Sequence, residues 1–248
     1  MRNIPQVSLL LYLGSVAFAF AADPSFIFDL KTKTTAPDVL TRVYGRGLDD
    51  DGAKEVPIAG GYDCNGDGHL DYAFAQIQGD PLGRIGVGEV TLVFGDGTIG
   101  GSIDSAIFQS RILRIAGSQN NETTGDEIWM GDVNGDGLGD LLIGRQNHSP
   151  SPSRRGAGAL SIVFGNPQLQ TQTESLSYLD LGNPPNGIQV ITFWGDSAYD
   201  RLGIWMRTGD ITGDGVSDVL VGADEVDGAG LPVSDNRGAT YVIRGGVY

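Results

Sequence analysis

The sequence is poor in cysteine, histidine and basic residues, and each shortage excludes a class of protein. One cysteine, Cys64, leaves no intrachain disulfide framework. Two histidines, His69 and His148, are too few for a His/Cys zinc cluster, and the chain after residue 22 has no Gly-x-Ser-x-Gly elbow. Lys and Arg number 16 against 31 Asp and Glu, and the net charge of −15 argues against nucleic-acid or anionic-membrane partners.

Signals for catalysis are equally scarce. His148 lies in the Ser/Pro-rich segment 147–153, which predicts a mobile loop with a solvated histidine and no general base. A carboxylate-pair glycosidase or lyase stays open, because acidic residues are abundant. We therefore expect no enzymatic activity.

Long apolar runs are confined to the amino terminus. Arg2 supplies a positive charge, residues 7–20 form an almost uninterrupted apolar core, and Ala19-Phe-Ala21 is a small-x-small cleavage site. Residues 1–22 are therefore predicted to be a signal peptide. A permanent anchor is the alternative, although the run is short for spanning a bilayer. Export predicts a secreted, extracellular or cell-surface protein, and the periplasm also fits.

Aspartate and glycine are abundant, and they gather in a nine-residue pattern that occurs three times. Oxygen-bearing side chains stand at positions 1, 3, 5 and 9, and Gly stands at position 6, where a tight loop needs a positive φ. Position 7 is assigned a backbone carbonyl ligand. Such oxygen sets suit hard cations, so the pattern predicts about three Ca²⁺ ions. The predicted ligands are Asp63, Asn65, Asp67, His69 and Asp71; Asp132, Asn134, Asp136, Leu138 and Asp140; and Asp210, Thr212, Asp214, Val216 and Asp218.

The spacing distinguishes this pattern from an EF-hand. An EF-hand loop needs Glu at position 12 and flanking helices, whereas position 12 here is Phe74, Ile143 or Val221, each within a short apolar run. Those runs predict buried strands, so the loops are expected to be strand-to-strand turns. The carboxylate at position 9 is expected to close each loop.

A longer repeat surrounds each loop. An apolar run ending in Gly precedes it, and a Gly-led strand follows it, as in residues 88–95, 158–165 and 238–245. The loops begin 69 and 78 residues apart, which leaves room for four short strands in each unit. With 39 glycines and no long helical pattern, the chain is predicted to be all-β and built of β-propeller blades.

These features resemble FG-GAP repeats, the blades of the integrin α-subunit β-propeller. Leu202-Gly203 stands where that family has Phe-Gly, residues 221–224 stand where it has Gly-Ala-Pro, and the calcium loops match almost position for position, with Thr212 as a departure. The resemblance covers about residues 26–248. It implies mainly structural calcium and a module for adhesion or for recognition of an extracellular protein or glycan. The alternative is an accessory propeller of a secreted hydrolase or lyase, phospholipase D-like or polysaccharide-active.

Residues 23–248 are predicted to hold three four-stranded blades, at about 41–110, 111–188 and 189–248. The inner strand of each unit precedes the loop, and the outer strand comes from the start of the next unit. Residues 41–44 are then an outer strand with no blade before it, and the third blade has no outer strand. Trp129 and Trp205, both in an Ile-Trp-Met context, are interpreted as equivalent core or channel-lining residues.

Three blades are too few to close a ring, because propellers have about four to eight. The chain is therefore predicted to be a partial or oligomer-completed propeller. Three arrangements are open. The chain is a fragment of a longer propeller, two copies of it close head to tail as a homodimer, or the three blades form an open array whose ends are buried on another protein.

Overall fold

The computed structural model describes residues 41–46, 58–98, 101–107, 109–175, 178–228, 235–246 and 248. The predicted signal peptide, residues 1–22, lies outside these ranges. Within them, no helix is long and apolar enough to cross a membrane.

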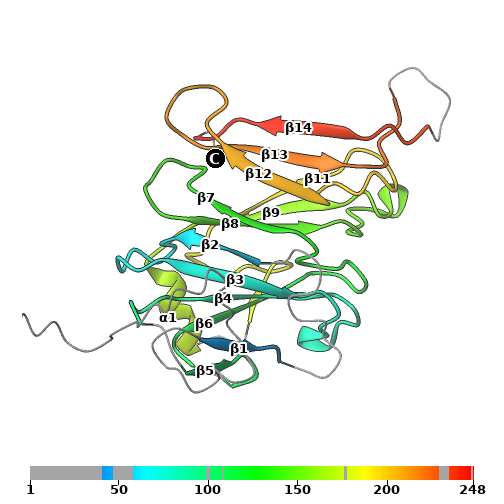
Figure 1. Ribbon diagram of the computed structural model, residues 1–248. Coiled ribbons are helices and arrows are strands. Elements are labelled where there is room, and N and C mark those ends of the chain that lie inside the picture. Colours follow the sequence, from blue (N-terminus) through cyan, green and yellow to red (C-terminus); the bar gives the residue numbers. More distant parts are fainter. Residues whose placement is uncertain are drawn as a thin grey trace, which may run out of the picture.

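The described chain is almost entirely β, as the sequence predicts. It contains 14 strands, one α-helix, α1 (Gln168–Ser175), and two 3₁₀ turns, η1 (Pro81–Gly83) and η2 (Pro152–Arg154). The sheets lie one above another, with the carboxyl-terminal strands at one end of the stack (Figure 1).

Three sheets, antiparallel except for β10, make up most of the stack. The first has the order β10-β6-β4-β3-β2, the second β11-β9-β8-β7 and the third β12-β13-β14. The first contains β2 (Ile58–Tyr62), β3 (Asp71–Gln76), β4 (Glu89–Val93) and β6 (Ile112–Ala116), with β10 (Leu179–Asp180) parallel to β6. The second contains β7 (Ile128–Gly131), β8 (Asp140–Arg145), β9 (Ala159–Val163) and β11 (Val190–Trp194). The third contains β12 (Trp205–Gly209), β13 (Asp218–Ala223) and β14 (Ala239–Ile243).

The strand order agrees with the order predicted from the repeat. In the first two sheets an inner strand precedes the aspartate loop, two strands follow it, and β6 or β11 arrives from the next unit as the outer strand. The third sheet has no fourth strand in the part of the chain that the structure describes. The described sheets form an open stack, and none of them closes on itself (Figure 1).

The prediction for residues 41–44 is wrong in its detail. β1 (Arg42–Tyr44) pairs in parallel with β5 (Ser102–Asp104) in a separate two-stranded ribbon. Val43 and Ile103 of this ribbon pack with Tyr72, Phe74 and other apolar residues of the first sheet. The ribbon therefore covers the outer face of the first sheet, the face turned away from the second sheet. The repeat had predicted an unpartnered strand for these residues.

Two apolar layers hold the three sheets together. One lies between the first and second sheets and includes Leu92, Leu113 and Ile143; the other lies between the second and third and includes Leu160 and Val219. Every residue of the central strands β4 and β9 is buried, because sheets or loops cover both of their faces. Each fully buried aliphatic side chain stabilises the fold by about 1.5–3 kcal/mol relative to exposure.

The two Ile-Trp-Met tryptophans are not equivalent, which corrects the sequence interpretation. Trp129 pairs with Leu142, whereas Trp205 pairs with Gly222, two residues further from its loop. Trp129 is half-buried, and its Nε1–H donates to Thr208 Oγ1 at 3.1 Å. Trp205 is 54% exposed, on the outer face of the third sheet. The two extra residues between Trp205 and the third loop account for this shift of register.

Candidate functional site

The three aspartate loops join the two strands of a hairpin in three successive sheets: β2–β3, β7–β8 and β12–β13. They lie at the same ends of the strands (Figure 1). Position 6 of each loop is a glycine with φ of 88° or 89°, namely Gly68, Gly137 and Gly215. A side chain would strain this left-handed backbone, which explains why glycine recurs there.

The first aspartate of each loop accepts hydrogen bonds from the loop backbone. The two carboxylate oxygens of Asp132 accept from Gly135 N at 2.7 Å and from Gly137 N at 2.9 Å. Asp63 and Asp210 accept from the corresponding glycines at 2.6–2.9 Å. This repeated geometry gives the three turns the same shape before any ion is considered.

The last aspartate of each loop is buried and ties the loop to the end of the second strand that follows it. Asp140 Oδ2 accepts from Val133 N at 2.8 Å, and its Oδ1 accepts from Gly165 N at 2.9 Å. Asp71 and Asp218 make the same pair of contacts in their own sheets. Position 9 therefore closes each loop through hydrogen bonds from the backbone at the start of the loop and from the glycine that follows the second strand after it.

The middle positions also bond within the loop. In the second loop, Asn134 Oδ1 accepts from Asp136 N at 3.0 Å, and Asp136 Oδ1 accepts from Leu138 N at 2.8 Å. In the described ranges, no group of three or more His, Cys, Asp and Glu side chains is arranged to hold a metal ion. Each predicted set of ligands thus lies within a single loop, and its side-chain oxygens accept hydrogen bonds from backbone N–H groups of that loop.

The donor chemistry of the loops nevertheless suits a hard cation. Every side chain at positions 1, 3, 5 and 9 offers oxygen, which is what Ca²⁺ prefers. Burial, together with the negative charges of Asp136 and Asp132, raises the pKa of Asp140 to about 6. A bound cation would relieve this repulsion, so the residues fit Ca²⁺.

The third loop differs from the first two in its counter-charge. Arg244 Nη2 lies 2.9 Å from Asp214 Oδ2, and this hydrogen bond lowers the pKa of the Asp214 carboxyl. Arg244 directly precedes Gly245, and the residues equivalent to it in the first and second sheets are Phe94 and Phe164. A guanidinium therefore already neutralises one of the carboxylates that calcium would use.

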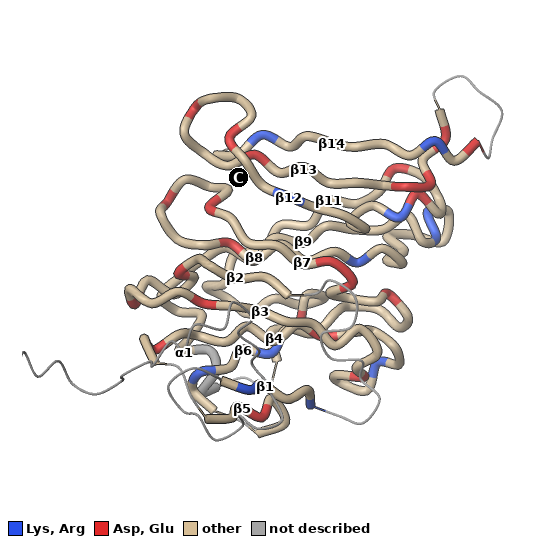
Figure 2. Tube along the Cα trace, viewed as in Figure 1, with Lys and Arg blue, Asp and Glu red and all other residues tan. Residues whose placement is uncertain are grey.

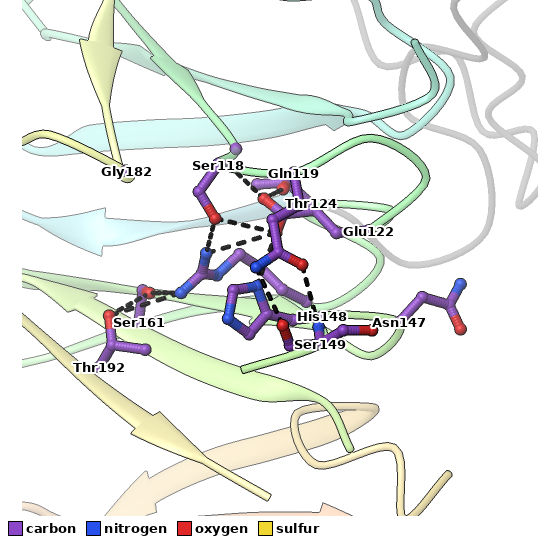
Figure 3. Close-up of polar contacts among 12 residues, drawn as sticks. Ser118, Gln119, Glu122, Thr124, Asn147, His148, Ser149, Ser161, Gly182 and Thr192 are labelled. Atoms are coloured by element: carbon purple, nitrogen blue, oxygen red, sulfur yellow. Dashed lines mark hydrogen bonds and ion pairs between the residues drawn. The ribbon is translucent and has the colours of Figure 1, made fainter. Parts of the chain in front are cut away.

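A second polar cluster lies at the opposite ends of the strands, and sequence reasoning missed it. His148 is only 5% exposed, and its Nδ1 lies 2.8 Å from Oε2 of the fully buried Glu122 (Figure 3). The prediction of a solvated His148 is therefore wrong, because Glu122 draws the imidazole into the interior. Arg145, 2% exposed, completes the cluster with Nη1 3.5 Å from Glu122 Oε2.

Glu122 stays ionised inside this cluster. Burial alone would raise the pKa of its carboxyl, but the hydrogen bond to His148 and the charge of Arg145 outweigh burial and lower it. Ser118 N and Thr124 Oγ1 also donate to Oε1, the latter at 2.9 Å. The one sequence signal was Arg145 itself, a charged residue directly after the apolar run 141–144.

Charge is distributed unevenly along the strands. Figure 2 shows Asp and Glu mainly in the loops at both ends of the strands, whereas the strands themselves carry few charges. The sheets thus form an apolar scaffold that presents polar loops at two ends.

No family model matches this chain. Integrin alpha-PS2 of Drosophila melanogaster is 26% identical over 187 residues, covering 73% of this chain and 12% of that protein. Phosphatidylinositol-glycan-specific phospholipase D of Bos taurus is 27% identical over 168 residues, covering 68% of this chain and 18% of that protein. The chain therefore spans less than a fifth of these relatives. The likeness supports the FG-GAP resemblance loosely and favours neither relative.

Proposed function

We propose that this chain is a segment of an FG-GAP-type β-propeller, stabilised by calcium, that recognises an extracellular ligand without chemistry of its own. The observation that carries the proposal is the threefold recurrence of one hydrogen-bonded aspartate loop at the same place in three successive sheets. Each copy keeps oxygen at all four of the positions from which a Ca²⁺ ion would be held.

About three Ca²⁺ ions are proposed, one in each loop, held by the side chains at positions 1, 3, 5 and 9 and the carbonyl at position 7. Bound calcium would neutralise the crowded carboxylates and fix the turn, so part of the folding free energy would be binding free energy. Each site would add about 2.7 kcal/mol of stability when free calcium is 100 times its Kd.

Melting curves in calcium and in chelator test this proposal. We expect chelation to lower the Tm by several degrees or more, because calcium binds the folded loops and not the unfolded chain. A matched control is a triple variant, Asp63→Asn, Asp132→Asn and Asp210→Asn, whose Tm should no longer respond to calcium. An unchanged wild-type Tm in chelator would refute the structural role of calcium.

The uncovered outer face of the third sheet supports the interpretation as a partial propeller. Trp205 and Val242 are more than half exposed there, whereas the ribbon of β1 and β5 covers the outer face of the first sheet. We propose that further sheets of the same kind cover this face, either in a longer chain or in a second copy. Native mass spectrometry in calcium distinguishes these cases. A two-chain mass with about six calcium ions would indicate an oligomer-completed ring, and a one-chain mass would exclude it.

The likeness to an integrin α chain, together with the predicted signal peptide, supports secretion or a cell-surface location and a role in adhesion. The ligand would be an extracellular protein or glycan. The likeness to a phospholipase D supports the second candidate, an accessory propeller of a secreted hydrolase. Determining the complete transcript separates the two, since adjoining blades favour adhesion and an adjoining catalytic domain favours the hydrolase.

A further inference from the structure

A cavity of about 340 Å³ is lined by residues at or just after the ends of β6, β8 and β11, which are the ends of β8 and its neighbours away from the second aspartate loop. Its lining comes from both the first and the second sheet and from the loops that follow their strands. The residues that matter for its chemistry are Ser118, Arg145, His148, Thr192 and Trp194. The cavity therefore sits on the boundary between two sheets, where loops from each converge.

The polar side of the cavity is built on the buried Arg145. Its Nη1 donates to Ser118 Oγ at 2.9 Å, and its Nη2 donates to Ser161 Oγ at 2.8 Å and to Thr192 Oγ1 at 3.4 Å. Its Nε is buried and finds no hydrogen-bond acceptor within the described ranges. A buried donor without a partner is costly, so this guanidinium is held in place by its other contacts, and the hydroxyl groups that it orders face the cavity.

His148 adds an acceptor to this polar side. An ionised Glu122 can only accept hydrogen bonds, so the 2.8 Å contact requires the proton on His148 Nδ1. In the neutral imidazole Nε2 is then an acceptor, whereas Arg145 donates and the hydroxyl groups of Ser118 and Thr192 can do either. Such a mixture of donors and acceptors suits hydroxyl groups, which are themselves both.

The charge of the buried cluster favours a neutral ligand on this side of the cavity. Glu122 lies 3.5 Å from Arg145 and compensates its positive charge, so the buried cluster is neutral while His148 is neutral. The net charge of −15 for the whole chain would further repel anions. The buried guanidinium is therefore better suited to hydrogen bonding than to pairing with a carboxylate, sulfate or phosphate.

Trp194 gives the cavity an aromatic wall. It is 55% exposed, and the guanidinium of Arg154 lies 5.7 Å from its ring centroid, a cation–π contact that restrains the indole. Exposed indoles offer a large apolar surface at low conformational cost. A ligand with an apolar face and hydroxyl groups around its edge would use both the wall and the polar side, and a pyranose sugar has this shape.

We propose that this cavity binds a single unit of a neutral glycan, with the sugar ring against Trp194 and its hydroxyl groups toward Arg145, His148 and Thr192. The proposal rests on the recognition function proposed above and names its ligand class and its site. Pockets of this kind, with an aromatic wall and a few convergent polar groups, are the usual form of small-ligand sites.

The test is binding of the mature chain, in calcium, to an array of immobilised neutral, uronic-acid and sulfated oligosaccharides. Trp194→Ala should weaken binding to the best neutral glycan about tenfold or more, as expected from losing an aromatic contact. Trp205→Ala is the matched control, because Trp205 is equally exposed but lies on the outer face of the third sheet. Its affinity should stay within about twofold of the wild type, and Thr192→Val should also weaken binding.

Three results would overturn the proposal: binding to acidic glycans only, equal losses in the two tryptophan variants, or no binding to any neutral glycan. None of them bears on the calcium proposal, which the melting curves decide separately. Recognition of a protein ligand with no glycan binding would leave the recognition function standing and remove this site.

Discussion

Replacing Glu122 by Gln should destabilise the fold far more than breaking a shorter but exposed ion pair does. Glu122 is fully buried, and its loss as an anion leaves Arg145 charged and uncompensated at 2% exposure. Removing one partner of a buried pair costs about 3–5 kcal/mol. For a domain of this size, where 1 kcal/mol moves the Tm by about 2–4 °C, the Tm should fall by roughly 6–20 °C.

The matched comparison is Asp96→Asn. Arg111 Nη1 lies 2.7 Å from Asp96 Oδ2, closer than Arg145 lies to Glu122, but both side chains are 30–42% exposed. Water and salt screen such a pair, so its loss should leave the Tm unchanged within error. Thermal melts followed by circular dichroism in calcium would measure both variants.

A double variant, Glu122→Gln with Arg145→Met, separates the charge from the packing. Removing both charges should recover much of the stability, because no buried ion is then left unpaired. The reasoning is refuted if Glu122→Gln changes the Tm no more than Asp96→Asn does, or if the double variant melts below the single one.

Two further predictions concern the loops. The pKa of Asp140 is raised from 3.8 to about 6, so the folded chain binds a proton at this carboxyl more tightly than the unfolded chain does. In chelator the Tm should therefore rise as the pH falls from 7 to 5. Asp140→Asn should remove most of that rise. In calcium the Tm should instead fall over this range, because protons compete with the cation. Asp136→Ala should lower calcium affinity and the Tm more than Thr212→Ala, because it removes a charged ligand and because Arg244 already partly neutralises the third loop; equal losses, measured by calorimetric titration, would contradict this ranking.

The strand order and the loops were accessible from sequence because both repeat. Gly at position 6 and Asp at position 9 recur in every unit, and each has one local physical reason, a positive φ or a closing hydrogen bond. Such local requirements do not depend on distant parts of the chain, so they can be read from the sequence alone. The calcium ligands, the blade boundaries and the signal peptide remain predictions.

Features that depend on register or on distant partners could not be predicted. The Ile-Trp-Met context suggested that Trp129 and Trp205 are equivalent, but two inserted residues move Trp205 along β12. The third sheet packs over Trp129, whereas Trp205 lies on the exposed face of that sheet. His148 resembled a loop histidine because its partner Glu122 is 26 residues away and no local pattern joins them. Residues 41–44 had the composition of an outer strand, and only the fold shows that β5 pairs with them.

The two ends of the strands therefore differ in how much they repeat, and this difference bears on function. Asp71, Asp140 and Asp218 begin β3, β8 and β13 and make the same contacts in all three sheets. The residues that end the same strands in the same register are unlike one another: Gln76 opposite Glu89, Arg145 opposite Ala159 and Ala223 opposite Ala239. A feature that every sheet needs is expected to recur in every sheet, whereas a binding site is needed only once. The aspartate loops fit the first description, and the cluster around Arg145 fits the second, so recognition is best sought at the end of the strands where the repeat breaks down.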